Sequence, residues 1–238
     1  MNAIETNNLT KYFGAVAAVD RLNLTVREGE LFALLGVNGA GKTTTIKLLS
    51  GLLRPTDGTA RVLGYDLKSE LPEIKQRIAV SPQETAVAPN LTVRENMELI
   101  ADIYGGDRGR VLTMLEELGL KKVEICRAKT LSGGWQRRLS IAMALVSDPK
   151  LLFLDEPTLG LDVLARRELW KVIAGLKGKV TVILTTHYLE EAEALANRVG
   201  VMGGGSLKIC GTPQELMEAA GTDRFEDAFI RLAGGEMP

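Results

Sequence analysis

The stretch Gly36-Val37-Asn38-Gly39-Ala40-Gly41-Lys42-Thr43 decides the fold of this chain, because it matches the pattern G-x-x-x-x-G-K-[ST] at every constrained position. The apolar residues 31–35 precede it, and residues 44–49 continue it with helical spacing until Gly51. Glycines let successive backbone N–H groups turn toward phosphate oxygens, and a helix that begins near Lys42 adds its positive dipole end. The stretch therefore predicts a site for a nucleoside triphosphate.

Each part of this loop has a predicted task. Lys42 neutralises the β- and γ-phosphates of the triphosphate, and Thr43 offers its hydroxyl to Mg²⁺. The alternative is a glycine-rich turn without a ligand, which the strand before it and the helix after it disfavour. The other predicted contacts to the nucleotide from this segment are Gly36, Asn38, Gly39, Ala40, Gly41 and Thr44.

Composition narrows the class of protein. The 238 residues carry 29 Lys and Arg against 30 Asp and Glu, so nothing in the net charge of −1 favours a nucleic-acid-binding surface, and no nucleic acid is expected as a partner. Cys126 and Cys210 lie far apart without a paired motif, which favours two reduced thiols in a cytosolic protein. Residues 1–6 lack the features of a secretory signal, and the longest apolar runs have the length of strands. We expect a soluble protein.

The order of predicted elements is α/β with one interruption. Short strands are expected within residues 1–30, then at 58–66, 76–83, 150–154 and 179–184, and as a pair within 198–210. Helices are expected at 163–176, at 188–197 and after Thr212-Pro213. From about Glu84 to Val146 the apolar residues follow helical spacing, which predicts a helical subdomain inserted into the sheet.

A second motif, Leu131-Ser132-Gly133-Gly134-Trp135-Gln136, makes the interpretation specific. It resembles the L-S-G-G-x-Q signature of the ATP-binding cassette (ABC) ATPases, and Leu151–Pro157 resembles the Walker B strand of that family. The resemblance covers about Leu9 to Leu216. It implies a P-loop NTPase fold with a RecA-like mixed sheet, an inserted helical subdomain and an antiparallel β subdomain, in one ATPase domain over 1–220 with a short tail over 221–238.

Four further side chains gain roles from this resemblance. Asp155 ends an apolar strand, where its carboxylate can hold Mg²⁺ through water, and Glu156 can accept a proton from the attacking water as catalytic base. Gln83 resembles the glutamine that contacts Mg²⁺ or the attacking water. His187 resembles the histidine that contacts the γ-phosphate and orients the reacting groups. Taken alone, an acidic pair before Pro157, a solvated Gln and a structural His would each be ordinary.

Two assignments depart from the family pattern or leave a choice. Leu159-Gly160-Leu161-Asp162 resembles the D-loop, but Leu159 stands where a serine is usual, so the role of that hydroxyl is lost while Asp162 remains as a site residue. An aromatic residue before a glycine near the amino terminus stacks on adenine in this family. Phe13 occupies the matching place and Tyr12 is the alternative.

The resemblance also implies a dimer. In ABC ATPases the signature segment of one cassette caps the γ-phosphate that the opposite cassette holds. One copy of each motif therefore implies two chains, head to tail, with two ATP molecules between them. Within the signature segment, Ser132, Gly133, Gly134 and Gln136 are the predicted contacts to the nucleotide. The predicted cofactors are ATP and Mg²⁺.

Three classes of function compete. The first is the ATP-hydrolysing subunit of a membrane transporter, bound to separate transmembrane permease subunits at the cytoplasmic face of the membrane. The second is a soluble ABC ATPase of DNA repair, translation or iron–sulfur assembly, and the third is a P-loop kinase or GTPase, which the signature disfavours. Residues 186–193 and 211–216 resemble ABC-2 type exporter cassettes for drugs, sodium or polysaccharides more than importers. We therefore expect an exporter of unspecified cargo, with an importer cassette as a further alternative.

Overall fold

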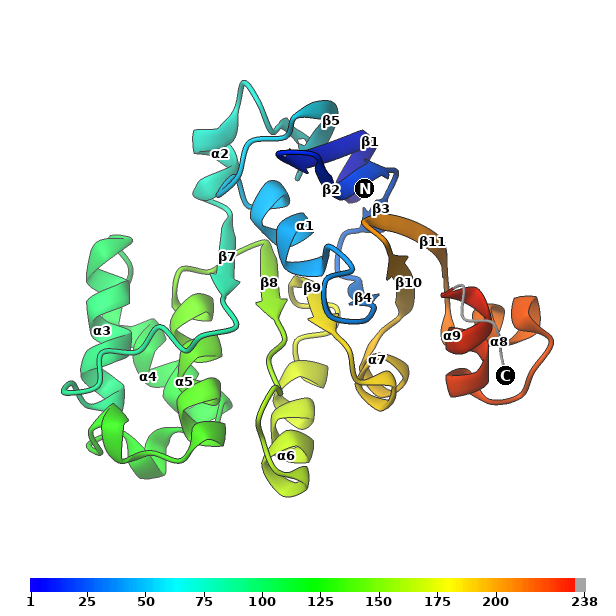
Figure 1. Ribbon diagram of the computed structural model, residues 1–238. Coiled ribbons are helices and arrows are strands. Elements are labelled where there is room, and N and C mark those ends of the chain that lie inside the picture. Colours follow the sequence, from blue (N-terminus) through cyan, green and yellow to red (C-terminus); the bar gives the residue numbers. More distant parts are fainter. Residues whose placement is uncertain (234–238) are drawn as a thin grey trace.

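Two β-sheets lie on either side of helix α1 (Lys42–Leu49), and three longer helices form a lobe beside them (Figure 1). The computed structural model describes residues 1–233 of the chain. The larger sheet has the strand order β11-β10-β4-β9-β8-β7, in which β11 alone is antiparallel to its neighbour. Its strands are β4 (Leu31–Leu35), β7 (Ile78–Ser81), β8 (Leu151–Asp155), β9 (Thr181–Thr186), β10 (Arg198–Gly203) and β11 (Ser206–Gly211).

The central strands of this sheet are buried on both faces. Every residue of β4, β8 and β9 is buried, as their nearly continuous apolar sequences predict for parallel strands. Alternate residues of β4 serve different cores: Leu31, Ala33 and Leu35 pack in the cluster shared with the helical lobe, whereas Phe32 and Leu34 pack with α1 and the second sheet. The three parallel strands thus end at one edge of the sheet, between the two cores.

The second sheet is antiparallel, with the order β2-β1-β5-β6 and β3 beside β1. Its strands are β1 (Asn2–Phe13), β2 (Val16–Leu22), β3 (Thr25–Arg27), β5 (Asp57–Val62) and β6 (Tyr65–Asp66). The expectation of short strands in this region is wrong for β1, which runs over 12 residues and pairs with three neighbours through register shifts. The strand expected at 58–66 is two strands, because Leu63 and Gly64 turn the chain with positive φ angles.

The helical lobe contains α3 (Val93–Ile103), α4 (Arg108–Glu117) and α5 (Gly133–Val146), with short 3₁₀ turns at Lys121–Val123 and Ala128–Thr130. Residues 84–91 are not helical, so the predicted start at Glu84 is wrong by about two turns. Helix α3 begins where Thr92 and Glu95 form a reciprocal capping box, which satisfies two backbone N–H groups at its start. Figure 1 shows this lobe standing beside β7, away from the antiparallel sheet.

The remaining helices are α2 (Leu71–Lys75), α6 (Val163–Ala174), α7 (Leu189–Leu195), α8 (Pro213–Ala220) and α9 (Phe225–Leu232). Helices α6 and α7 are each shorter than predicted. The five-residue helix α2 was not predicted. Thr212 caps α8 as expected, with Glu215 in a second capping box. The segment treated as a tail contains α9, which buries Phe225 and Ala228 against the body of the molecule. Residues 234–238 of that segment lie outside the described part.

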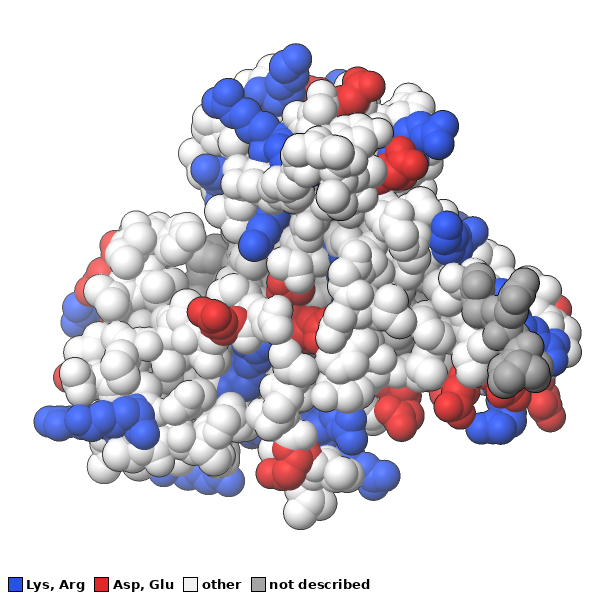
Figure 2. Space-filling view, viewed as in Figure 1, with Lys and Arg blue, Asp and Glu red and all other residues white. Residues whose placement is uncertain are grey.

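The surface is mixed in charge. Figure 2 shows Lys and Arg interspersed with Asp and Glu around the rim of the viewed face, while most of its centre is uncharged. Within residues 1–233, no helix combines the length and the hydropathy that a membrane span needs. Cys126 and Cys210 are both free thiols and are partly buried.

Candidate functional site

The phosphate loop connects the end of β4 to the start of α1, at the edge where the parallel strands end. Gly39 and Gly41 have φ angles of +83° and +99°, a region that favours glycine. A Cβ atom on Gly41 would lie 2.4 Å from the carbonyl oxygen of Ala18, and one on Gly36 would lie 2.5 Å from that of Met202. Because Gly41 caps α1 without a side chain, the N–H groups of the first helical turn remain available to an anion.

A cavity of about 470 Å³ opens at this loop. Besides the loop, it is bordered by side chains from the ends of β1, β7, β8 and β9, so that segments far apart in the sequence converge on it. Its lining residues are Phe13, Ala18, Asn38, Gly39, Ala40, Gly41, Lys42, Thr43, Thr44, Gln83, Glu156, Leu159 and His187. Of the predicted phosphate-loop contacts, all but Gly36 line the cavity, and Gly36 instead supplies a carbonyl oxygen to Lys42.

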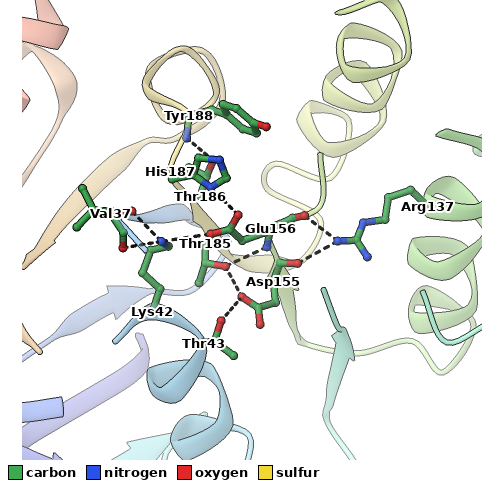
Figure 3. Close-up of polar contacts among 11 residues, drawn as sticks. Val37, Lys42, Thr43, Arg137, Asp155, Glu156, Thr185, Thr186, His187 and Tyr188 are labelled. Carbon is green, nitrogen blue, oxygen red and sulfur yellow. Dashed lines mark hydrogen bonds and ion pairs between the residues drawn. The ribbon is translucent and has the colours of Figure 1, made fainter. Parts of the chain in front are cut away.

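Lys42 is buried, and its ammonium group points toward Val37 of the loop (Figure 3). Its Nζ donates to the carbonyl oxygens of Gly36 at 2.7 Å and Val37 at 3.2 Å, and lies 3.2 Å from Oε1 of Glu156. Both charged side chains of this pair are at least nine-tenths buried. The cation is therefore held at the floor of the cavity in a fixed position.

Oxygen atoms that could hold a metal ion lie at Thr43, the residue after Lys42, and at Asp155. The hydroxyl of Thr43 donates to Oδ1 of Asp155 at 3.0 Å, and the hydroxyl of Thr185 donates to the same oxygen at 2.5 Å. Within residues 1–233, no group of three or more His, Cys, Asp or Glu could form an all-protein metal cage. One carboxylate with one hydroxyl at a phosphate-binding loop fits Mg²⁺, which prefers oxygen ligands and takes several of them from water and substrate phosphates.

Glu156 follows directly after β8 and has a φ angle of +47°, which is rare for a residue with a side chain. Its N–H lies 3.1 Å from the carbonyl oxygen and 3.0 Å from the hydroxyl of Thr185, which hold this turn against β9. Its carboxylate extends between two groups: Oε1 faces Lys42, and Oε2 lies 2.6 Å from Nδ1 of His187. Figure 3 shows this carboxylate between Lys42 and His187.

The predicted adenine and Gln contacts reach the cavity to different degrees. Phe13 lines it with about half of its surface exposed, whereas Tyr12 is not among the lining residues, so the geometry favours Phe13. Gln83 lines the cavity from the exposed segment that follows β7. Leu159 also lines it, at the position where the family has a serine.

The signature segment lies elsewhere. Ser132 is the N-cap residue of α5 and is exposed, as is Gly133, and neither Ser132, Gly133 nor Gly134 lines the cavity at the phosphate loop. Gln136 donates to the carbonyl oxygens of Ala128 and Leu131, which fixes the approach to α5. Asp162 accepts a hydrogen bond of 2.8 Å from the N–H of Ala165 and so caps α6. The chain therefore holds the two predicted halves of a nucleotide site apart.

Three functional or buried polar residues were missed by the sequence analysis. Arg137 is buried beside Glu156, and burial lowers the pKa of its guanidinium. Thr185 holds Asp155 and Glu156. Glu191 is fully buried, accepts from the indole of Trp170 at 2.9 Å, and has a pKa that burial raises. The one available signal was the spacing of Arg137, which falls on the same helical face as the apolar Ile141.

Known proteins resemble this chain over nearly its whole length. The probable multidrug ABC transporter ATP-binding protein YbhF of Escherichia coli (strain K12) is 41% identical over 239 residues, which cover 96% of this chain and 41% of that protein. The daunorubicin/doxorubicin resistance ATP-binding protein DrrA of Streptomyces peucetius is 42% identical over 238 residues, 96% of this chain and 72% of that protein. The chain thus spans less than half of the first relative.

Solved structures agree with the fold. The ATP-binding subunit of an ABC transporter superposes with a TM-score of 0.85 at 28% identity, covering 97% of this chain and 99% of that one. A dimeric ATP-binding cassette in a post-hydrolysis state, bound to ADP and Pi, has a TM-score of 0.77 at 27% identity and covers 88% of this chain and 98% of its own. The predicted α/β fold of an ABC ATPase is confirmed.

The family model described as ABC transporter matches residues 19–159, from β2 through the cavity-lining Leu159. That range contains the phosphate loop, Gln83, the signature segment and Glu156. The resemblance stated from the motifs alone is therefore confirmed. This chain belongs to the ATP-binding cassette family of ABC transporters.

Proposed function

We propose that this chain is the ATP-binding and ATP-hydrolysing subunit of an ABC exporter, with Glu156 as the base that activates water. The observation that carries the proposal is the Glu156 carboxylate at the cavity, between Lys42 and His187. Water attacks the γ-phosphorus, the bond to the ADP oxygen breaks, and Glu156 takes the proton of the water. His187, held on Oε2, orients this carboxylate and contacts the γ-phosphate.

Lys42 links substrate binding to the release of the base. Its Nζ lies 3.2 Å from Oε1 of Glu156 and also donates a hydrogen bond to the carbonyl oxygen of Gly36 in the loop. A triphosphate in the cavity carries more negative charge than a single carboxylate and competes for the ammonium group. When Lys42 turns to the phosphates, Oε1 of Glu156 becomes free to accept the proton from water.

Mg²⁺ is the proposed metal. Thr43 and Asp155 hold it, and Gln83 contacts it or the attacking water. When bound, Mg²⁺ neutralises charge on the β- and γ-phosphates. Thr185 supports this site because its hydrogen bond keeps Oδ1 of Asp155 at the end of β8.

The second half of the site is proposed to come from another copy of the chain. Ser132 and Gly133, at the start of α5, are exposed and lie outside the cavity of their own chain. A helix start with free N–H groups binds anions, so this segment suits the γ-phosphate of an ATP held by a partner cassette. The dimeric cassette among the similar structures supports a dimer, and the head-to-tail arrangement is proposed from the exposed signature segment.

The substitution Glu156→Gln tests the base. It keeps the shape of the side chain but cannot accept a proton, so we expect kcat for ATP hydrolysis to fall by about 10²–10⁴-fold while ATP binding persists. The variant should also accumulate the ATP-bound dimer in light scattering. Turnover of Glu156→Gln within threefold of the unmodified chain would remove Glu156 as base.

Export is proposed because the similar proteins YbhF and DrrA bear the names of multidrug and drug-resistance transporter subunits. A shallow groove between β7, α3 and α5 suits a short apolar segment of a permease. Ile100, Tyr104, Met143 and Ala144 line it, and Ile103, the last residue of α3, is two-thirds exposed. Through such a permease the cassette would sit at the cytoplasmic face of the membrane.

Co-expression with a candidate permease, such as a polytopic membrane protein found to be encoded beside its gene, tests this assignment. We expect the cassette to co-purify with that protein, and Tyr104→Glu to reduce the complex at least tenfold, since a charge buried in an apolar contact is costly. Glu98→Gln, on the same helix, is the matched control. A cassette that hydrolyses ATP yet stays out of membranes with any neighbouring permease would favour a soluble ABC ATPase, and ATP-driven uptake by the complex would favour an importer.

A further inference from the structure

Arg137 has an unusual set of partners. It lies in the first turns of α5, is 5% exposed, and directs its guanidinium toward the end of β8 from the side opposite Lys42 (Figure 3). Four hydrogen bonds leave this group. They go from Nε to the carbonyl oxygen of Pro157 at 2.7 Å, from Nη1 to that of Pro82 at 2.6 Å, and from Nη2 to those of Asp155 at 3.1 Å and Glu156 at 2.7 Å.

All four partners are backbone carbonyl oxygens, and within residues 1–233 no carboxylate lies in ion-pair distance of Arg137. Buried arginines commonly pair with a carboxylate, which neutralises them. Here Asp155, Glu191 and Glu156 act only through longer-range attraction, while desolvation lowers the pKa of the guanidinium. The contacts therefore fix the course of the backbone, which is a task for a planar fork of donors.

The two segments that Arg137 joins both carry proposed site residues. Pro82 is followed directly by Gln83, and Asp155, Glu156 and Pro157 form the acidic turn. One turn further along α5, the hydroxyl of Ser140 shares a hydrogen bond of 2.9 Å with that of Ser81. Helix α5 thus holds the segment before Gln83 and the segment around Glu156 through neighbouring side chains.

Glu156 is the residue with the greatest need of such support. Its φ of +47° lies in the left-handed region, where a side chain strains the backbone unless its surroundings hold it. Thr185 binds its N–H from β9, and Arg137 binds its carbonyl oxygen from α5. The peptide groups on both sides of the proposed base are therefore fixed, by two different elements.

We propose that Arg137 is a positioning residue that holds Glu156 and Gln83 in register with the start of the signature helix. This inference rests on the proposed role of Glu156 in ATP hydrolysis. Arg137 touches neither cavity nor substrate and acts through the backbone of the residues that do. Its loss leaves the phosphate loop intact and lets the carboxylate of Glu156 move away from the attacking water.

The test compares Arg137→Lys and Arg137→Gln with Arg138→Lys as matched control. Lysine keeps the charge of Arg137 without the fork, and glutamine offers two donors at most. Arg138 lies on the same helix but stacks on Trp135 and makes one hydrogen bond of 3.4 Å. We expect both Arg137 variants to lose about 10–100-fold in kcat, because a displacement of about 1 Å is that costly, with KM for ATP within threefold. Arg138→Lys should keep kcat within twofold.

A double-mutant comparison separates positioning from general destabilisation. In the Glu156→Gln background, Arg137→Lys should lower the residual turnover by less than twofold, because the group it positions is already inactive. Two independent losses that multiply would contradict the inference. So would kcat within threefold of the unmodified chain in either Arg137 variant, or failure of both variants to bind a fluorescent ATP analogue. Normal ATP hydrolysis by Glu156→Gln would disprove the proposed role of Glu156 as base, independently of Arg137. If Arg137→Lys still lost activity in that case, Arg137 would act on the reaction through a residue other than Glu156, and this inference would be wrong.

Discussion

The phosphate loop and the signature segment are both glycine-rich starts of helices, but their surroundings differ. Around the phosphate loop, Lys42, Asp155, Glu156 and His187 converge from α1, β8 and β9, and three of the four are buried. At the signature segment, Ser132 is exposed and its side chain makes no capping hydrogen bond within the described residues. The first region is assembled by the fold of one chain. The second exposes Ser132 and Gly133, as expected for the proposed half of a site that a second molecule would complete.

The largest effects are expected from two variants, one of which disables the phosphate loop and the other the signature segment. Lys42→Ala removes the cation at the floor of the cavity, and we expect a loss of about 10²–10³-fold in ATPase activity together with weak nucleotide binding. Ser132→Glu places a carboxylate where the partner's γ-phosphate would lie, so it should abolish the dimer and its activity but keep nucleotide binding. ATPase assays and scattering on the separate variants measure both.

Mixing the two variants tests the head-to-tail arrangement directly. In a mixed dimer, one site combines both defects, and the other combines an intact loop with an intact signature segment. We therefore expect the mixture to recover activity that neither variant has alone, up to about a quarter of the unmodified level when half of the dimers are mixed and one of two sites works. A mixture as inactive as its components would contradict the shared site, whereas activity of Ser132→Glu alone would show that one chain suffices.

A smaller effect is expected from changing Thr43, whose hydroxyl donates to Asp155 at the proposed metal site. Thr43→Val removes the hydroxyl but preserves the volume of the side chain, so the loop should still form while Mg²⁺ binds more weakly. We expect the Mg²⁺ concentration for half-maximal ATPase activity to rise about 10–100-fold, with smaller change at saturating metal. Thr44→Val is the neighbouring control for the metal alone: Thr44 also lines the cavity, but in the described part of the chain its hydroxyl makes no hydrogen bond to Asp155. We therefore expect its Mg²⁺ dependence to stay unchanged even where KM for ATP rises. An unchanged Mg²⁺ dependence would place the metal on other groups.

The sequence predicted the region around the phosphate loop better than it predicted the residues that hold that region in place. The apolar runs of β4, β8 and β9 and the spacing of the loop are local patterns, so their placement followed directly. Strand β1 was predicted too short because its buried residues come in adjacent pairs, Ala3-Ile4 and Leu9-Thr10, and do not alternate with exposed ones. No period of two therefore marks the whole strand. The helical block was predicted to begin at about Glu84, although the helical spacing that indicates it begins at Val93, so residues 84–91 had no helical pattern of their own.

The supports of Glu156 could not be predicted for a different reason. An arginine in a helix is usually solvated, and its contacts to Pro82 and Pro157 join positions 55 and 20 residues away in the chain. The left-handed backbone of Glu156 likewise arises from tertiary contacts and has no signature in its residue type. Motifs predicted the proposed reacting groups, whereas the residues that hold them depend on how α5 packs beside β8.

The smallest effect is expected at the adenine of the nucleotide. Two neighbouring residues, Phe13 and Tyr12, serve as test and control. Phe13 lines the cavity with about half of its surface exposed, while its neighbour Tyr12 is similarly exposed but is not among the lining residues. If Phe13 stacks on adenine, Phe13→Ala should raise KM for ATP by about 3–10-fold with little change in kcat, because one aromatic contact contributes about 0.5–1.5 kcal/mol. Tyr12→Ala should leave KM within twofold. The opposite pattern would assign adenine to Tyr12, and a change in neither would place the base on another part of the cavity, most directly a surface that the second chain contributes.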